Sequence, residues 1–289
     1  MEIQEAAQRW KVSERWVRIL CEEGRVPGAK KQDGMWLIPE NAVKPVRKSR
    51  KPETLLTRLQ AERKLKMKGG IYHRIQVDMT YNSNHMEGSR LTHDQTRYIY
   101  ETKTIGSEEN TAIPVNDILE TVNHFRCMDY IIDTAEKELT QPYIQRLHAM
   151  LKTGTEDEMQ GFAVGKYKRY PNEVGDHVTT PPENVSAEMA RLLTKYKEQE
   201  KTLETLVSFH ADFESIHPFQ DGNGRVGRLI LFKECLHYGI VPFIITDELR
   251  LYYYRGLSRW KDEKGFLMDT CLTAQDAMKK YLDYFRIPY

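Results

Sequence analysis

The sequence has few cysteines, no long apolar run and no leader pattern at its start. Its 289 residues include four cysteines, which lie far apart without paired metal-ligand spacing, so neither a disulfide framework nor a zinc site is expected. No apolar run approaches the roughly 18 residues that a membrane-spanning helix needs. The opening stretch MEIQEAAQRW lacks the basic region and apolar stretch of a signal peptide. These absences predict a soluble protein with no membrane partner and a cytoplasmic location.

Charge is balanced overall, at a formal +1, but it is uneven along the chain. Residues 1–51 hold 12 Lys and Arg against 7 Asp and Glu, a balance of +5. The remaining residues hold 31 against 35, a balance of −4. The sequence therefore predicts a basic module attached to a mildly acidic body, and the basic module is the part to test for nucleic-acid binding.

Residues 3–45 have the pattern of two short helices followed by a small hairpin. Ser13 precedes the second helical pattern as an N-cap, and Gly24 ends that helix. The segment VPGAKKQDGMWLIP then predicts two short strands around the turn at 33–34. This order resembles the winged helix-turn-helix of the excisionase and MerR-like families, which implies a DNA-binding domain over residues 1–46.

In such modules the second helix enters the major groove and the wing lies near phosphates. The resemblance implies DNA contacts by Arg15 and Arg18 on the second helix and by Lys30 and Lys31 on the wing. Because a basic surface alone is weak evidence, a solvated scaffold for protein docking is the alternative. Residues 47–54, rich in Lys and Arg, predict a basic linker.

Residues 55–289 form a larger second domain in the sequence pattern. Apolar residues recur at helical spacing through most of it, for example over 203–216 and 225–238. One segment, residues 165–182, instead has β-forming residues around turn residues and predicts a hairpin. The predicted fold class is mainly α, a helical core with one hairpin, preceded by the small winged helix-turn-helix domain.

The segment SIHPFQDGNGRVGRLIL, residues 215–231, places two glycines between two predicted helices. Gly222 and Gly224 permit positive φ angles and close backbone approach, so consecutive N–H groups can converge on one anion at the positive end of the following helix. Arg225 and Arg228 lie one turn apart on that helix, within reach of the same polyphosphate. The spacing predicts a site for a nucleotide pyrophosphate.

Two further side chains in this segment suggest the chemistry. Asp221 would repel a phosphate directly, but a carboxylate there can hold a magnesium ion that bridges phosphate oxygens. His217 is the residue suited to take a proton from an attacking hydroxyl near neutral pH. Each could instead be structural, because buried histidines and Asp–Arg pairs are common. The residues alone lead to nucleotide-dependent transfer to a hydroxyl.

The run HPFQDGNGRVGR resembles the signature of the Fic family, His-x-Phe-x-Asp/Glu-Gly-Asn-Gly-Arg-x-x-Arg, at all eight fixed positions. The resemblance covers roughly residues 55–285 and implies a Fic-type helical core with a β-hairpin flap. It also implies transfer of AMP from ATP to a Tyr, Ser or Thr hydroxyl of a target protein, with Mg2+ as cofactor. In these terms His217 is the general base, Asp221 holds Mg2+, Gly222, Asn223 and Gly224 position the α-phosphate, Arg225 takes the β-phosphate and Arg228 the γ-phosphate.

Other activities within the family stay open. Family phosphotransferases carry lysine at the position of Gly224, so the glycine favours AMP transfer. Transfer of UMP or phosphocholine is not excluded by the signature. The family also includes homodimers and higher assemblies, which makes a homo-oligomer an alternative to a monomer.

The same resemblance assigns two further regions. The hairpin 165–182 is similar to the family flap, which pairs with an extended stretch of the target and would place Lys166, Tyr167 and Lys168 near the docking edge. A simple cap on the core is the alternative. The helix containing LYYYRGLSRW resembles the one that borders the nucleotide base, with Tyr252 and Tyr253 as candidate contacts. Aromatic clusters on helices are more often core, which is the alternative there.

The run SNHMEG, residues 83–88, resembles the family's inhibitory motif, Ser/Thr-x-x-x-Glu-Gly/Asn. The resemblance implies that Glu87 pairs with Arg228 and blocks the γ-phosphate, while Ser83 supports the inhibitory helix. The alternative is an exposed helical glutamate. A second hypothesis for the whole chain is a DNA-binding transcription regulator whose body senses nucleotide without catalysis, although an intact His217 argues against it.

Overall fold

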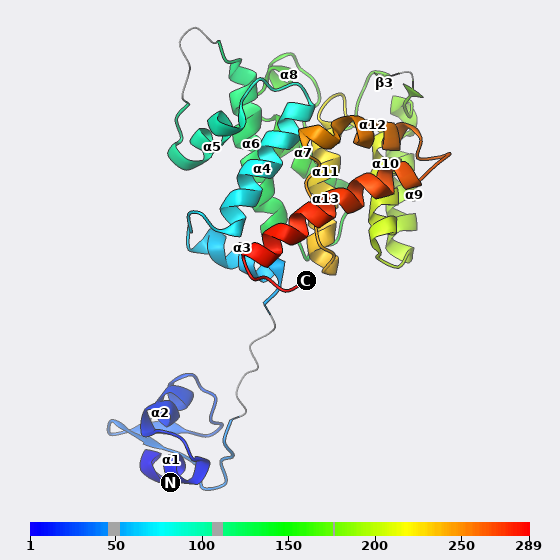
Figure 1. The fold of residues 1–289 in the computed structure, drawn as a ribbon. Coiled ribbons are helices and arrows are strands. Elements are labelled where there is room, and N and C mark those ends of the chain that lie inside the picture. Colours follow the sequence, from blue (N-terminus) through cyan, green and yellow to red (C-terminus); the bar gives the residue numbers. More distant parts are fainter. Residues whose placement is uncertain (46–52, 106–111, 176) are drawn as a thin grey trace. The chain divides into compact units, whose positions relative to one another are not determined.

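The computed structural model describes residues 1–45, 53–105, 112–175 and 177–289, and divides into two compact units, Met1–Pro52 and Glu53–Tyr289. Figure 1 shows both units. Residues 46–52 lie outside the described residues, so most of the linker predicted over 47–54 falls there. None of the helices in the described ranges is long and apolar enough to cross a membrane.

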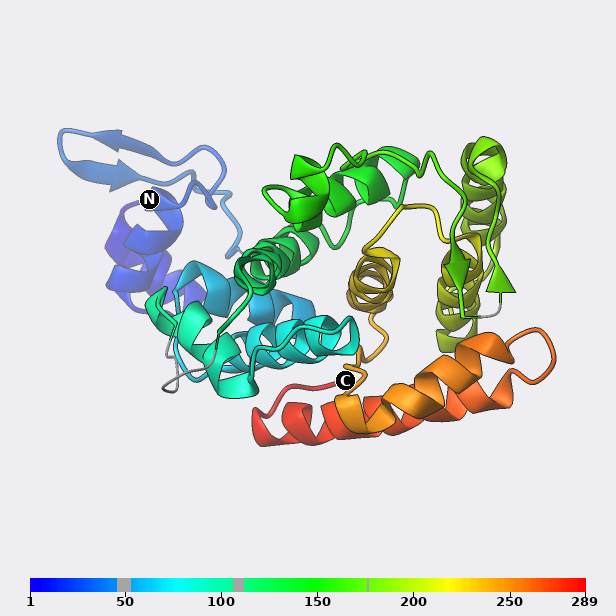
Figure 2. The ribbon, with the colours of Figure 1, turned by 90° about the horizontal axis from the view of Figure 1, so that it is seen from above.

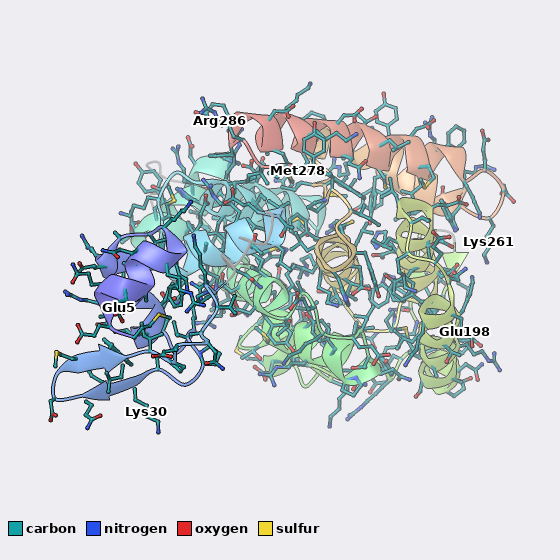
Figure 3. The ribbon with its side chains drawn as sticks, turned by 90° about the horizontal axis from the view of Figure 1, so that it is seen from below. Glu5, Lys30, Glu198, Lys261, Met278 and Arg286 are labelled. Atoms are coloured by element: carbon teal, nitrogen blue, oxygen red, sulfur yellow. The ribbon has the colours of Figure 1, made fainter. Side chains whose placement is uncertain are left out.

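The first unit contains α1 (Ile3–Trp10), α2 (Glu14–Glu22), β1 (Lys30–Gln32) and β2 (Met35–Leu37). The Ser13 side chain caps α2 by accepting the Trp16 N–H at 3.3 Å. β1 and β2 pair antiparallel, and the turn between them has positive φ at both Asp33 and Gly34. Figure 3 shows Lys30 on the strand side of this unit and Glu5 on its helical side. The unit's buried residues are Ala6, Ala7, Trp10, Val17, Leu20, Cys21, Val26, Ile38 and Ala42.

The second unit is mainly helical, as the sequence predicts. Its helices are α3 (Leu55–Lys64), α4 (Ile71–Met86), α5 (His93–Thr102), α6 (Val115–Asp133), α7 (Gln141–Lys152), α8 (Glu156–Met159), α9 (Pro182–Glu198), α10 (Leu203–Ile216), α11 (Asn223–Tyr238), α12 (Arg250–Ser258) and α13 (Gly265–Tyr284), with a short 3-10 turn η1 (Asp247–Leu249) before α12.

Helix α11 lies in the middle of this unit. Figure 2 views it end on, with α4, α6, α7, α10 and α13 around it, and it packs against α3, α4, α6, α7 and α10. Because it is surrounded, α11 buries residues on nearly every side, including the charged Arg225, Arg228, Lys233 and Glu234. Each of these charges needs a partner inside the protein. The ends of α11 are therefore where polar networks form.

The hairpin predicted over 165–182 is much shorter in the structure. β3 (Glu173–Val174) and β4 (His177–Val178) are two residues each and pair antiparallel. The residues before β3 have no regular pairing because their polar groups bond the α10–α11 loop. Lys168 N donates to Pro218 O at 2.9 Å, and the Asn172 side chain donates to Phe219 O at 3.1 Å.

Candidate active site

The α10–α11 loop, residues 217–222, is closed by a side chain from the next helix. Asn223 is 1% exposed, and its amide accepts from Phe219 N and donates to Phe219 O, both at 2.8 Å. Gly222 caps α11 with a φ of 80°, a conformation that favours glycine. The loop thus fixes the position of the start of α11, whose positive dipole end is suited to an anion.

The role expected for Asn223 differs from its placement. The sequence reading gives it the α-phosphate, but both ends of its amide are bonded to the Phe219 backbone. Its observed contacts make it the residue that holds the loop shape. The backbone N–H groups at the start of α11 are the donors that remain for an anion at this position.

A histidine that the sequence analysis missed packs against the α10–α11 loop. His148 of α7 stacks on Phe219 with ring centroids 3.9 Å apart. Its Nδ1 accepts the Gly165 N–H at 2.9 Å, so the proton lies on Nε2, which donates to Asp221 O at 3.1 Å. Burial, the largest cause, lowers the pKa of His148 to about 4. This histidine is therefore neutral near pH 7 and keeps both bonds.

His217 is placed at the end of α10 in a left-handed conformation, with a φ of 51°. Its Nδ1 faces the carbonyl of Glu214 at 3.4 Å. Since a carbonyl can only accept, Nδ1 carries the hydrogen and Nε2 keeps its lone pair. Burial lowers the pKa of His217, which favours the neutral form. The side chain thus has the tautomer that a general base requires.

Asp221 lies between two buried cations. Lys152 Nζ bonds its Oδ2 at 2.6 Å and Arg225 bonds the same oxygen at 3.2 Å. Burial alone would raise the pKa of Asp221, but the charges of Arg225 and Lys152 outweigh it and lower the pKa to about 2. The side chain keeps 52% of its surface exposed. An ionised, half-exposed carboxylate is suited to be an oxygen ligand of a hard cation such as Mg2+. This ion is usually held by one or two protein carboxylates together with the phosphates of the substrate.

The placement of Arg225 also differs from expectation. It is 2% exposed, and its guanidinium bonds Asp221 and Glu120 of α6. A direct contact with the β-phosphate would compete with these ion pairs for the guanidinium. The observed contacts favour a positioning role, in which Arg225 fixes the Asp221 carboxylate.

Arg228 faces a different carboxylate. It is 4% exposed, and its Nη2 donates to Glu87 Oε1 at 2.8 Å and to Ser83 O at 2.9 Å, while its Nε donates to Ser83 Oγ at 3.0 Å. Both partners belong to the C-terminal end of α4, and the Glu87 side chain is 25% exposed. A Cβ atom on Gly224 would lie 2.4 Å from Glu87 Oε1. The Glu87 carboxylate therefore lies directly over the first turn of α11, where the sequence predicts a phosphate.

A second carboxyl lies near this pair and was missed by the sequence analysis. Glu214 of α10 packs against Gly227, where a Cβ would lie 2.3 Å from its Oε1. This buried oxygen has no hydrogen-bond partner among the residues that the structure describes. Burial, the largest cause, raises the pKa of Glu214 to about 8 even though the charge of Arg228 opposes the shift. Glu214 is therefore mostly protonated near pH 7.

The three residues predicted to lie at the docking edge of the flap differ in their exposure and contacts. Lys166 is exposed, whereas Tyr167 packs on Phe219 and donates to Gln141 at 2.9 Å. Lys168 is 4% exposed, and its Nζ bonds Asn172 and Thr179, both at 2.6 Å. Since its ammonium bonds two residues of the same segment, the docking role expected for Lys168 gives way to one of holding the shape of that segment.

The tyrosines of α12 also differ in their exposure. Tyr253 is 1% exposed and bonds His210 at 2.7 Å, which matches the core alternative left open by the sequence. Tyr252 is 53% exposed. Tyr254, which the sequence analysis did not select, donates to Met86 O at 3.2 Å, next to Glu87. Of the two predicted base contacts, only Tyr252 has an exposed ring.

Comparison with known proteins agrees with this geometry. The model of the Fic/DOC family matches residues 138–234. The chain is 30% identical over 190 residues to a protein adenylyltransferase Fic of Nematostella vectensis, which covers 62% of this chain and 42% of that protein. It is 32% identical over 129 residues to a probable protein adenylyltransferase of Aquifex aeolicus, over 43% of this chain and 40% of that one. The chain thus spans less than half the length of these relatives.

Two solved structures share the fold. A Fic domain containing signaling protein from Bacteroides thetaiotaomicron superposes with a TM-score of 0.64 at 22% identity, over 79% of this chain and 94% of that one. A Fic-1 fragment from C. elegans superposes with a TM-score of 0.62 at 19% identity, over 80% of this chain and 72% of that one. Residues 138–234 therefore match the Fic/DOC family, the helical unit shares the fold of solved Fic structures, and the chain has homologues among the Fic protein adenylyltransferases.

Proposed function

We propose that this protein transfers AMP from ATP to a Tyr, Ser or Thr hydroxyl of a target protein, and that Glu87 inhibits the transfer. The observation that carries the proposal is the arrangement around the first turn of α11. A neutral histidine, a half-exposed carboxylate and a helix N-terminus meet at one loop, and the names of the homologues supply the class of reaction.

In this mechanism His217 Nε2 takes the proton of the target hydroxyl as its oxygen attacks the α-phosphate. The bond from the α-phosphate to the bridging oxygen of the β-phosphate breaks, and pyrophosphate leaves. The Glu214 carbonyl keeps the imidazole in the required tautomer. The N–H groups at the start of α11 stabilise the negative charge that develops on the α-phosphate. Asp221 would hold a magnesium ion, which supplies charge neutralisation on the phosphates when bound.

The inhibition follows from where Glu87 lies. Its carboxylate is paired with Arg228 and covers Gly224, so the γ-phosphate of a productively bound ATP would meet a like charge at its own site. Replacing Glu87 removes that charge and frees Arg228 for the phosphate. Ser83 supports the inhibited state by bonding the same guanidinium.

The test uses purified Glu87→Gly and Glu87→Gly/His217→Ala proteins with Mg2+, α-labelled ATP, GTP, UTP and CTP, and cell lysate, followed by intact mass. We expect an AMP adduct with the first variant and a loss of about 10²–10⁴-fold in the second, the usual effect of removing a general base. Glu87→Gln keeps the size of the side chain without its charge, so it should also label faster than wild type.

The outcomes separate the alternatives. Preference for another nucleotide would assign transfer of that monophosphate. Absence of labelling in both variants, with nucleotide still bound, would favour the nucleotide-sensing regulator. Equal labelling by wild type and Glu87→Gly would reject the inhibition by Glu87.

A second proposal concerns the first unit, which we infer binds DNA. Its support is the charge of +5 over residues 1–51 and the exposure of Arg15, Arg18, Lys30 and Lys31. Each side chain that neutralises a phosphate contributes about 0.9 to the slope of log K against log salt. Arg15→Ala/Arg18→Ala in the full chain should therefore reduce that slope by about 2 in a mobility-shift assay. Absence of any complex with DNA would favour the protein-docking alternative, and an unchanged slope would exclude these two arginines as phosphate contacts.

A further inference from the structure

Lys152, at the C-terminal end of α7, is a buried lysine surrounded by carboxylates. It is 2% exposed, and its Nζ bonds Glu120 Oε1 and Asp221 Oδ2, both at 2.6 Å, and also contacts Asp157 Oδ2. The three acids come from α6, from the loop before α11 and from α8. One ammonium therefore joins three segments that are distant in the sequence.

The three carboxylates are arranged as metal ligands usually are. One oxygen from each lies within 4.8 Å of the others, a spacing that suits a single cation. Hard divalent ions prefer such clusters of carboxylate oxygens. Here the ammonium of Lys152 bonds all three acids, and it does so with the direct, short contacts of a ligand shell.

The charge count explains why a cation is needed there. Three carboxylates packed together repel one another, and Glu120 is nearly buried. Lys152 and Arg225 supply two positive charges against the three negative ones, which leaves a formal charge of −1. That remaining charge is at the exposed edge of the network, because Asp221 is its most exposed member at 52%.

We propose that Lys152 is a positioning residue that takes the place of a metal ion in the Glu120, Asp157 and Asp221 cluster, so that the site binds a divalent cation only together with the nucleotide. The ammonium fixes Asp221 Oδ2 from the inside and leaves the exposed side of the carboxylate for the ion that arrives with ATP. The catalytic role of Lys152 rests on the AMP transfer proposed above. That its ammonium occupies the carboxylate cluster does not depend on that proposal.

The test measures binding of Mn2+ to nucleotide-free protein by electron paramagnetic resonance, for wild type and Lys152→Ala. Removing the ammonium leaves three acids with a free cation position, so the variant should gain one Mn2+ site at least about tenfold tighter than any in wild type. Mn2+ should also raise the melting temperature of Lys152→Ala more than that of wild type, because an ion that binds only the folded state stabilises it.

Lys233→Ala is the matched control. Lys233 is equally buried, but its Nζ bonds one carboxylate, Glu234, and the carbonyl of Lys137. It should lose stability without gaining a Mn2+ site. If Lys152→Ala fails to fold, Lys152→Gln serves as the second variant, and adding Asp157→Asn to either should remove the gained site.

The results decide the proposal without reference to activity. A Mn2+ site of equal affinity in wild type and in the Lys152 variants would overturn it, as would an equal gain in Lys233→Ala. If the Lys152 variants gain the site but no AMP adduct forms in any background, the cluster assignment stands and the proposed function fails. Lys152→Arg keeps a cationic side chain in the cluster. In the absence of nucleotide it should bind Mn2+ no better than wild type.

Discussion

Arg225 and Arg228 lie one turn apart on α11 and are both almost fully buried, at 2% and 4% exposure, yet they are held in different ways. Arg225 belongs to a closed network with Glu120, Asp221 and, through these acids, Lys152. Arg228 pairs with the carboxylate of Glu87, which is 25% exposed at the end of α4.

The difference indicates which anion partner can be exchanged. Removing one member of the Arg225 network leaves several buried charges uncompensated, which costs more than a ligand contact returns. Opening the Arg228 pair moves one carboxylate, already 25% exposed, toward water, and a phosphate can replace it. We therefore regard the Arg225 side as a fixed scaffold and the Arg228 side as the exchangeable one.

The largest expected effect is on the scaffold side. Glu120→Ala removes the acid that bonds both Lys152 and Arg225, and it should lower the free energy of unfolding by about 3–5 kcal/mol, the usual cost of breaking a buried ion pair. Chemical denaturation checks this. Glu138→Ala, at an exposed pair with Lys197, should change little, and Glu87→Gly should lose far less than Glu120→Ala. Equal losses at Glu120 and Glu87 would remove the distinction.

The next effect tests the loop that joins the two sides. Asn223→Ala leaves the buried N–H of Phe219 unpaired, while the C=O keeps only the Asn172 amide as a donor, and the change should cost about 1–3 kcal/mol. Asn223→Asp keeps an acceptor for the N–H but loses the donor to the carbonyl, so it should fall between alanine and wild type. Asn116→Ala, which loses one exposed bond to Glu156 N, is the control. A loss no greater than that of the control would mean that the loop keeps its shape without Asn223.

Much of this architecture could be predicted from the sequence where the pattern is local. The helix expected over 203–216 matches α10, and the helix expected over 225–238 begins only two residues earlier, at Asn223. The glycines and the capping geometry between them are read directly from neighbouring residues. The mainly helical fold is likewise confirmed.

The buried polar partners could not be found in this way. Lys152 is 69 residues from Asp221, and Glu120 is 105 residues from Arg225, so no spacing connects them. Both lie on helices whose polar positions look like solvent-facing ones in a periodic pattern. The pairing of Glu87 with Arg228, 141 residues apart, was anticipated only through the family resemblance. The predicted length of the hairpin was wrong for a related reason, because the Lys168 N–H and the Asn172 side chain bond the α10–α11 loop in place of a second strand.

A further prediction tests whether Glu214 is ionised in the folded protein. If it were, Arg228 would have a second carboxylate partner, and the difference between Arg225 and Arg228 would be smaller. Its folded-state pKa of about 8 lies above the ordinary 4.5, so the folded protein keeps a proton that the unfolded chain has lost between these values. The contribution of Glu214 to the stability of the wild type should therefore decrease as the pH rises from 4.5 to about 8. Glu214→Gln lacks this loss and should be more stable than wild type by about 2 kcal/mol at pH 6, and by more as the pH rises toward 8.

Well below pH 4.5, where Glu214 is protonated in both states, the two proteins should unfold alike. Thermal unfolding across pH 4 to 9 measures the difference. Glu138→Gln, at an exposed site, should follow wild type throughout. A pH-independent difference between Glu214→Gln and wild type would mean that Glu214 stays ionised in the fold, and then Arg228 would have two carboxylate neighbours and resemble Arg225.

The smallest effect concerns what keeps the exchangeable pair closed. Ser83→Ala removes the bond from Arg228 Nε to Ser83 Oγ, while the bond from Nη2 to the Ser83 carbonyl remains. One such bond contributes about 1 kcal/mol, so ATP affinity and the initial rate of labelling should rise about fivefold, less than in Glu87→Gly. Ser258→Ala, at an exposed helix end, should match wild type. In Glu87→Gly the serine has no inhibitory pair left to support, so adding Ser83→Ala should raise the rate no further; a second, additive increase would mean that Ser83 restrains Arg228 on its own.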